Sequence, residues 1–328
     1  MKAVLCRDYG PIEQLAIEDL PPPSLPAGSV RIAVRAASVN PPDVLMPQGK
    51  YQVKPPVPFI PGVECMGTVL ELGAGVDDLR VGERVMAYPG VGCYAEQVVA
   101  PRSRVERVPP GMDDQAASGF VLVYSTAFHA LVDCGRLAAG ETLVVLGAAG
   151  GIGLCAIQLG KALGATVIAV ASTPEKRAIC REQGADHLID SSTENLTERI
   201  RALTGGPGAD VILDVVGGDV TDRALRAVRP YGRYLIAGYA SGVIPMIKGN
   251  VVLLKQAQVI GVSYRLLLER DPAQAAANLG ALCRLFEQGR LRPLVTAEFP
   301  LVRIVDALKE VGERRVIGKV AVMVADGG

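Results

Sequence analysis

The sequence has no C-x-x-C pair, although its 328 residues include seven cysteines. An odd number of cysteines without close pairs predicts neither a disulfide framework nor a zinc knuckle. The 34 basic and 34 acidic side chains cancel, so bulk charge gives no reason to expect a nucleic acid or an anionic membrane as partner. There is no uncharged apolar stretch of about eighteen residues, and the first ten residues lack the apolar run of a secretory signal. We therefore expect a soluble cytoplasmic protein that binds neither membrane nor nucleic acid.

Proline is unevenly distributed along the chain. Sixteen of the 23 prolines lie between Pro11 and Pro110, a density that interrupts helices and favours short strands joined by turns. A chain of this length with 49% hydrophobic residues exceeds the usual size of one core, so we expect two domains. The predicted domains are residues 1–118 with 265–328, mainly antiparallel β, and residues 119–264.

From about Asp113, apolar helical windows alternate with unbroken apolar strands, which is typical of a parallel sheet covered on both faces. The helix expected over residues 152–163 carries one charge, Lys161, and must be nearly buried against that sheet. A helix over 273–288 follows, and an apolar strand over 316–322 could return to the first domain. The predicted strands of the parallel sheet are Thr142–Leu146, Thr166–Ala171, Val211–Val216, Tyr234–Ala237 and Val259–Val262.

A glycine-rich loop joins the first of these strands to the buried helix. It reads Gly147-Ala148-Ala149-Gly150-Gly151-Ile152-Gly153 and fits the A-x-G-x-x-G dinucleotide fingerprint from Ala148. Glycine at 150 lets the backbone approach a pyrophosphate, and Gly153 lets the helix pack closely on the strand. Glycines also make ordinary tight turns, but the strand before and the helix after favour a dinucleotide site whose phosphates face the helix N-terminus.

The second strand ends without the acid that usually binds the ribose hydroxyls of NAD. Ser172 stands there, and Thr173 and Lys176 can donate hydrogen bonds to a 2′-phosphate, so we expect NADPH. In the alternative reading, Lys176 and Arg177 form a solvated helix face and Glu175 is a displaced acid. Val216, Gly238 and Tyr239 complete the candidate cofactor-binding residues.

Both halves of the chain together resemble the medium-chain dehydrogenase/reductase superfamily, and within it the zinc-free NADPH:quinone oxidoreductases. The resemblance covers almost the whole length. It implies a Rossmann-type doubly wound parallel sheet beside a GroES-like antiparallel β-barrel domain, hydride transfer from NADPH to quinones or related enones, and a homodimer formed through the terminal Rossmann strand. The motifs that carry it are AASVNPPD at 36–43, PGVE at 61–64, VGERV at 81–85, the glycine loop and GKV at 318–320.

The PGVE motif raises the question of a metal. The zinc alcohol dehydrogenases of the superfamily have a histidine ligand where Val63 stands and a cysteine ligand where Asn40 stands. Valine cannot ligate zinc and an amide is a poor ligand, so we expect no metal site. Cys65 is then a small buried side chain, and Glu64 a buried acceptor that organises backbone or a neighbouring cation rather than a base.

The resemblance places the substrate in a cleft lined by Asn40, Asp43 and Tyr51, with Thr126. Hydride addition builds negative charge on a carbonyl oxygen, which hydrogen-bond donors stabilise. Asn40 is an amide donor, and Tyr51 stays protonated at neutral pH and can give a proton or a hydrogen bond. Asp43 is interpreted as a structural acceptor. Alternatively, Asn-Pro-Pro-Asp is only a turn and Tyr51 packs a loop.

Two other functions remain open. An enoyl-thioester reductase would use a similar fold and the same hydride chemistry. A non-catalytic NADPH-binding protein, crystallin-like or RNA-associated, is the alternative of another class, although the neutral composition lacks the basic patch that RNA binding normally needs. His129 and His187 lie in no recognisable metal or triad motif and are interpreted as structural.

Overall fold

The computed structural model describes residues 1–324, which fold as two compact units. Unit 1 comprises Met1–Leu122 and the segment from Pro293 onward, and unit 2 comprises Val123–Arg292. Residues 265–292 therefore group with unit 2, whereas the sequence analysis assigned them to the first domain. Hydrogen bonds explain the difference, because Asn278 and Arg292 bond to Asp133 and Gln158 within unit 2. No helix in the described part of the chain is long and apolar enough to cross a bilayer.

Unit 1 is built on a mainly antiparallel sheet of order β14-β15-β3-β4-β5-β7, with β6 also paired to β3 and a separate β1-β2 pair. Only the β14-β15 pair among these is parallel. The strands are β1 Lys2–Leu5, β2 Ala16–Asp19, β3 Ser29–Val39, β4 Cys65–Leu72, β5 Arg84–Ala87, β6 Gln97–Pro101, β7 Val105–Arg107, β14 Val295–Pro300 and β15 Lys319–Met323. The helices are η1 Ile12–Gln14, α1 Pro41–Leu45, η2 Arg102–Arg104, α2 Asp114–Ser118, η4 Leu301–Arg303 and α11 Ile304–Gly312.

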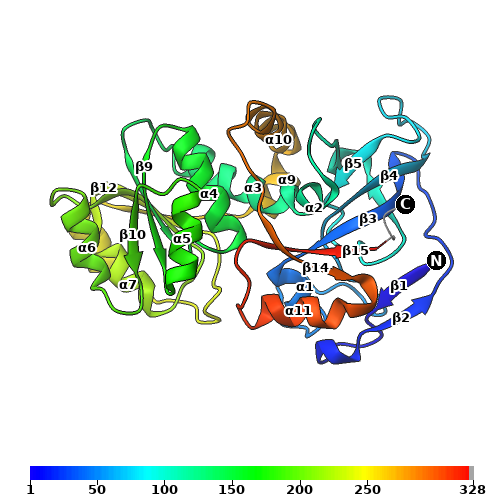
Figure 1. The fold of residues 1–328 in the computed structure, drawn as a ribbon, viewed down its shortest axis with the longest axis horizontal. Helices are drawn as coiled ribbons and strands as arrows, with labels where there is room; N and C mark the ends of the chain where they lie inside the picture. The colour runs from blue at the N-terminus through cyan, green and yellow to red at the C-terminus, as the bar shows by residue number, and fades with distance from the viewer. Residues whose placement is uncertain (325–328) are drawn as a thin grey trace. The chain divides into compact units, whose positions relative to one another are not determined.

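A strand from the C-terminal part of the chain completes this sheet. Strand β15 pairs antiparallel with β3, with Val320 opposite Val39, so the C-terminal strand returns to the first domain as predicted (Figure 1). Val320 and Val322 are buried in the same core as Val30, Ile32 and residues of α11. The return strand therefore fixes the position of Lys319, the first residue of β15.

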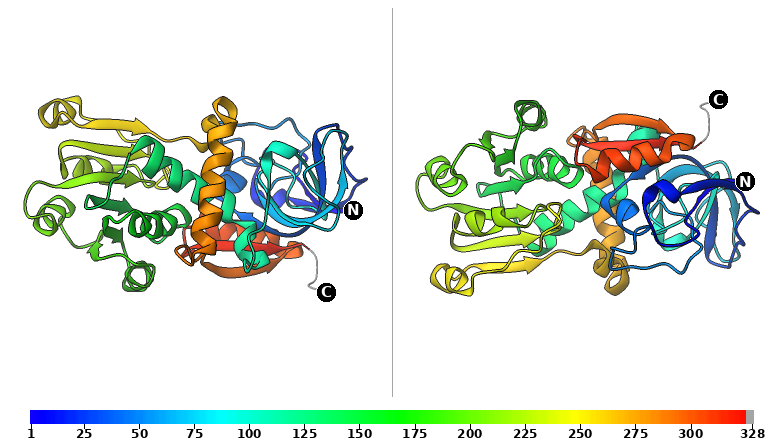
Figure 2. Two further views of the ribbon diagram at one scale, coloured as in Figure 1. Left: turned by 90° about the horizontal axis from the view of Figure 1, so that it is seen from above. Right: turned by 90° about the horizontal axis from the view of Figure 1, so that it is seen from below.

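Unit 2 holds a parallel sheet of order β10-β9-β8-β11-β12-β13, with connecting helices packed on it (Figure 2). This is the strand order of the doubly wound Rossmann fold, which confirms the predicted fold class. The strands are β8 Thr142–Leu146, β9 Thr166–Ala171, β10 His187–Asp190, β11 Ala209–Asp214, β12 Val228–Ile236 and β13 Gln258–Gly261. The helices are η3 His129–Cys134, a π-helix, then α4 Gly151–Ala162, α5 Pro174–Glu182, α6 Leu196–Leu203, α7 Asp219–Leu225, α8 Gly249–Lys255, α9 Tyr264–Arg270 and α10 Pro272–Glu287. Helix α3, Phe120–Phe128, includes the boundary between the units.

Strands β8 and β9 have the bounds that the sequence predicted, but β11 ends two residues earlier than expected. The buried carboxylate of Asp214 accepts hydrogen bonds from the backbone N–H groups of Val216 and Gly217, at 2.8 and 2.9 Å. A side chain that bonds the backbone two and three residues later turns the chain out of the sheet. The hydrophobic run continues through Val216, which is why the pattern alone placed the strand end too late.

Candidate active site

The glycine loop lies between β8 and α4, with its backbone pressed against the helix. A Cβ on Gly153 would lie 2.5 Å from the carbonyl oxygen of Gly147 and 2.6 Å from that of Ala148, so only glycine fits. This is the close approach that the sequence predicted at Gly153. Ala148 also donates its N–H to Val170 of β9, at 3.2 Å. The loop is thus anchored to the sheet.

Helix α4 presents its N-terminus at this loop, with Gly150 as the N-cap residue. The first N–H groups of a helix have no acceptor within it, and its dipole adds positive potential at that end. Gly150 brings no side chain between this backbone and a ligand, and a Cβ there would have only one close neighbour, the Gly147 oxygen at 3.4 Å. The residues from Ala148 to Gly153 therefore fit a pyrophosphate.

At the end of β9 the chain turns directly into helix α5. Thr173 caps α5 by accepting a hydrogen bond from the backbone N–H of Lys176, and Ser172 is exposed just before it. Arg177 is paired with Asp190 at the end of β10, at 2.8 Å, and donates to the carbonyl of Ala171. Arg177 therefore joins two strand ends instead of forming a solvated face. Ser172, Thr173 and Lys176 remain the candidate groups for binding a 2′-phosphate at this strand end.

The remaining candidate cofactor residues lie in the loops after β11 and β12. Val216 accepts a backbone hydrogen bond from Ser241, and Tyr239 is 40% exposed. A Cβ on Gly147 would lie 2.8 Å from Val216 Cγ2, so Val216 packs directly against the glycine loop. Gly238 follows β12 by two residues. These loops stand at the carboxyl ends of parallel strands, the edge where doubly wound sheets bind ligands.

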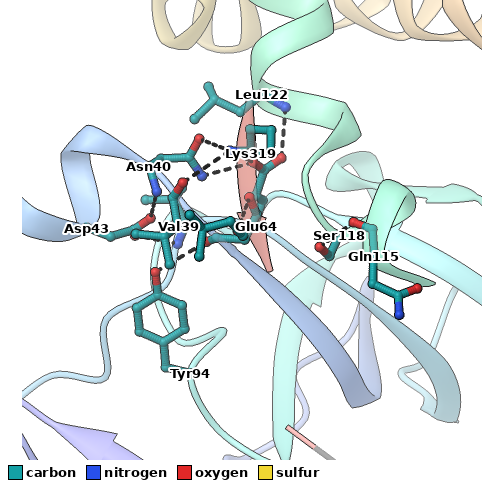
Figure 3. Close-up of polar contacts among 12 residues, drawn as sticks. Val39, Asn40, Asp43, Glu64, Tyr94, Gln115, Ser118, Leu122 and Lys319 are labelled. Carbon is teal, nitrogen blue, oxygen red and sulfur yellow. Dashed lines mark hydrogen bonds and ion pairs between the residues drawn. The ribbon is translucent and has the colours of Figure 1, made fainter. Parts of the chain in front are cut away.

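In unit 1, Asn40, Glu64 and Lys319 form a buried polar network (Figure 3). Asn40 donates its amide N–H to Glu64 Oε1 at 2.9 Å, and its Oδ1 accepts from Lys319 Nζ at 2.6 Å. The lysine ammonium also lies 3.5 Å from Glu64 Oε1. Both ends of the Asn40 amide thus have partners of opposite hydrogen-bonding character, so its orientation is fixed.

Glu64 is fully buried and ties three parts of unit 1 together. Besides Asn40 and Lys319, its Oε2 accepts the backbone N–H of Leu122 in α3 at 2.9 Å. The predicted role of Glu64, a buried acceptor that organises backbone and a neighbouring cation, is confirmed. Cys65 next to it is 1% exposed, as expected for a small buried side chain.

Asp43 closes the turn that begins with Asn40. Its two carboxylate oxygens accept the backbone N–H groups of Asn40 and Val63, at 2.8 and 2.9 Å. Burial raises the pKa of Asp43 to about 7, against the opposing effects of the Asn40 hydrogen bond and of Lys319. These contacts make Asp43 an acceptor that holds α1 against the Pro61–Glu64 motif, the structural interpretation made from the sequence.

Tyr51 and Thr126 occupy different units. Tyr51 is half-buried after α1 and packs against the apolar cluster of Cys6, Met46, Phe59 and Val63. Thr126 is 6% exposed on α3. Of the candidate catalytic residues, the structure brings Asn40 and Asp43 into direct contact, while Tyr51 lies on an adjoining part of unit 1.

Two residues of these sites escaped sequence reasoning. Lys319 was noted only as part of the GKV motif. A single lysine at the start of an apolar strand could have indicated a buried cation there. Asp214 accepts from the hydroxyls of Thr221 and Tyr234, at 2.6 and 2.7 Å, as well as from the loop backbone. A single acid at the end of an apolar strand could have indicated that Asp214 accepts hydrogen bonds from the loop that follows.

Comparisons with known proteins agree with this architecture. Residues 26–110 match the alcohol dehydrogenase GroES-like domain family, and residues 151–280 match the zinc-binding dehydrogenase family. The chain is 34% identical over 98% of its length to a quinone oxidoreductase-like protein 2 homolog of Nematostella vectensis, of which it covers 88%. The chain belongs to the medium-chain dehydrogenase/reductase superfamily, in its quinone oxidoreductase-like group.

Solved structures of the superfamily have the same fold. A probable oxidoreductase from Mycobacterium abscessus superposes with a TM-score of 0.90 at 34% identity, covering 99% of both chains. A mycobacterial protein solved as a complex with NADPH superposes with a TM-score of 0.92 at 27% identity, covering 99% of this chain and 100% of its own. The family membership thus extends over both units.

Proposed function

We propose that the chain is an NADPH-dependent oxidoreductase that transfers hydride to quinones or related α,β-unsaturated carbonyls without zinc. The observation that carries the proposal is the anchored glycine loop at the N-terminus of α4, next to a β9 end that has Ser172 in place of an acid. When bound there, NADPH supplies a hydride to the acceptor. Ser172, Thr173 and Lys176 hold the 2′-phosphate, which an acid at this position would repel.

The buried network supports zinc independence. Zinc needs several nitrogen, sulfur or carboxylate ligands around one point. Val63 offers none, and the Asn40 amide is engaged by Glu64 and Lys319. The ammonium of Lys319 already places a positive charge beside Glu64. Within residues 1–324, no three His, Cys, Asp or Glu residues gather in a group that could hold a metal ion.

The acceptor oxygen then needs a protein donor. We assign this role to the Tyr51 hydroxyl, which can donate a hydrogen bond to the developing oxyanion and a proton to the product. Asn40 is the second candidate, with one amide hydrogen committed to Glu64. Thr126 is a further candidate from α3, and Asp43 positions α1.

We further propose that the protein is a cytoplasmic homodimer. All seven cysteines are free, as suits a reducing compartment. Strand β13 has β12 as its neighbour in the sheet and forms an edge, where a second copy can pair. The preceding helix α8 exposes Leu253 and Leu254, 76% and 82% accessible, which pairing would cover.

A substrate screen tests the proposal. Purified enzyme is given quinones, alkenals and enoyl thioesters with NADPH, and the loss of NADPH absorbance is followed with and without a zinc chelator. We expect turnover with quinones or alkenals that the chelator does not change. Turnover confined to enoyl thioesters would identify the alternative reductase, and about one tightly bound zinc per chain with activity lost on chelation would refute zinc independence.

A further inference from the structure

The connection that follows α3 winds as a π-helix, η3, over His129–Cys134. Its wider turns appear in the backbone, where Gly135 donates to the carbonyl of Ala130, five residues back, at 2.7 Å. In an α-helix, residues five apart point about 140° away from each other. The π-helical turn instead brings Cys134 next to His129. Single-turn π-helices are frequent at functional sites.

Three side chains line up on this turn. Cys134 Sγ lies 3.5 Å from His129 Nε2, and His129 Nδ1 lies 2.7 Å from Asp133 Oδ2. When Nδ1 carries the proton and donates it to Asp133, Nε2 is left as the acceptor for the thiol. The order is that of a nucleophile, a base and a carboxylate that orients the base.

The carboxylate is itself held from another helix. Asn278 of α10, which is 4% exposed, donates its amide N–H to Asp133 Oδ2 at 2.7 Å. Gln274 one turn earlier donates to Asn278 Oδ1 at 2.8 Å, which fixes the amide orientation. This support resembles the way catalytic histidines are usually positioned.

Access leaves two of the thiols as candidates, and only Cys134 has the His129–Asp133 pair described above. Of the seven cysteines, all within the described residues, five are buried and only Cys134 and Cys283 are half-buried. His129 and Asp133 keep 14% and 22% of their side-chain surface accessible. Each of the three side chains on this turn therefore keeps part of its surface accessible.

We propose that Cys134 is a nucleophile, activated by His129, that adds covalently to conjugated carbonyl compounds. His129 Nε2 takes the thiol proton while sulfur bonds to the β-carbon and the C=C π pair moves toward the carbonyl oxygen. The imidazolium then returns the proton to the enolate, so nothing is oxidised and nothing leaves. Asp133 is a positioning residue that stabilises the imidazolium. In this addition the proton that leaves the thiol also neutralises the enolate, so the nucleophile and the proton carrier act as a pair.

The effect of Asp133 separates this mechanism from ordinary thiol reactivity. Burial, and then the charge of Asp133, raise the pKa of the Cys134 thiol. If Cys134 reacted as a simple thiolate, Asp133→Asn would lower that pKa and speed the reaction. If His129 takes the proton, the same change slows the reaction, because the imidazolium loses its partner. The two mechanisms predict opposite signs.

The experiment treats the full chain, without NADPH, with limiting N-ethylmaleimide, and maps the adducts by peptide mass spectrometry. We expect Cys134 to react first and Cys283, the internal reference, much later. His129→Gln should slow Cys134 at least about tenfold, Asp133→Asn should also slow it, and His187→Gln, which changes the other histidine, should leave the rate unchanged.

The outcomes are distinguishable. Equal rates at Cys134 and Cys283, or an unchanged or faster reaction of Cys134 in Asp133→Asn, would overturn the proposal. If the His129→Gln variant is unfolded, its buried cysteines will also be labelled. In that case the near-isosteric Asp133→Asn variant decides between proton transfer to His129 and simple thiolate reactivity. Because no NADPH is present, the result is independent of the proposed hydride transfer.

Discussion

Replacing Glu64 by glutamine should destabilise unit 1 although the two side chains have the same shape. The glutamine oxygen can still accept from the Leu122 N–H, but its amide nitrogen then faces the Asn40 Nδ2, and two donors meet. Rotating the Asn40 amide by 180° only moves the conflict, since its NH2 group would then face the Lys319 ammonium. No arrangement of the three side chains satisfies the network.

The magnitude follows from burial. Glu64 is 0% and Lys319 8% exposed, so the substitution leaves a buried ammonium without its carboxylate. Breaking such a pair typically costs about 3 kcal/mol or more. For a unit of this size, about 3 kcal/mol corresponds to a fall in Tm of roughly 6–12 °C.

A double-mutant cycle provides the assay. Unfolding free energies are measured by urea denaturation for Glu64→Gln, Lys319→Met and the double variant. In the double variant Asn40 can rotate to accept from the glutamine without facing an ammonium, so we expect a favourable coupling of about 2 kcal/mol. Glu71→Gln, which changes a carboxylate of the same unit that is 59% exposed and paired with Arg31, is the control and should change stability by less than about 0.5 kcal/mol. A Glu64→Gln effect as small as this control, or a double variant that simply adds the two losses, would refute the reasoning.

Four further outcomes are expected. Ser172→Asp should reverse or flatten the NADPH preference, measured as the ratio of catalytic efficiencies with NADPH and NADH; equal efficiencies in the unmodified enzyme would contradict the assignment. Tyr51→Phe should lower turnover about a hundredfold with little change in cofactor affinity, and unchanged turnover would transfer the role to Asn40 or water. Leu254→Glu should convert a dimer to a monomer in light scattering, whereas an unmodified protein that is monomeric at micromolar concentration would exclude the dimer. Because the pKa of Asp43 is raised from 3.8 to about 7, its ionisation opposes folding, so stability should fall as pH rises from about 4 to 7, and Asp43→Asn should reduce that slope in unfolding measurements.

The fold was largely predictable because its signals are local. The bounds of β8 and β9 follow from apolar runs ended by glycine or serine, and α4 follows from a helical window with one charge. The boundary at 265 was misplaced because what joins residues 265–292 to unit 2 is long-range. The Asn278 to Asp133 bond spans 145 residues, and no periodicity records it.

The sites were predictable only in part, for the same reason. The glycine loop is a contiguous motif whose steric requirement can be read residue by residue. Lys319, the partner of Asn40 and Glu64, lies by contrast at the start of β15, 279 residues away from Asn40. His129, interpreted as structural, meets Cys134 only because the helix widens there. Spacing rules for an α-helix do not predict that contact.

The network also accounts for the acid of the Pro61–Glu64 motif, which stands beside Val63 and bonds Asn40, the two residues that the family resemblance relates to zinc ligands. An unpartnered carboxylate in this core would be costly, and an apolar side chain would remove the carboxylate that accepts the Leu122 N–H and that balances the charge of the Lys319 ammonium. Glu64 satisfies both, while Lys319 also bonds the carbonyl of Val39 at 3.2 Å. Each of the three residues depends on the other two, since removing any one leaves a partner's polar group buried in the core without that contact. The contacts of Glu64 account for its place without a metal, because they join the N-cap residue of α1, helix α3 and the returning strand β15.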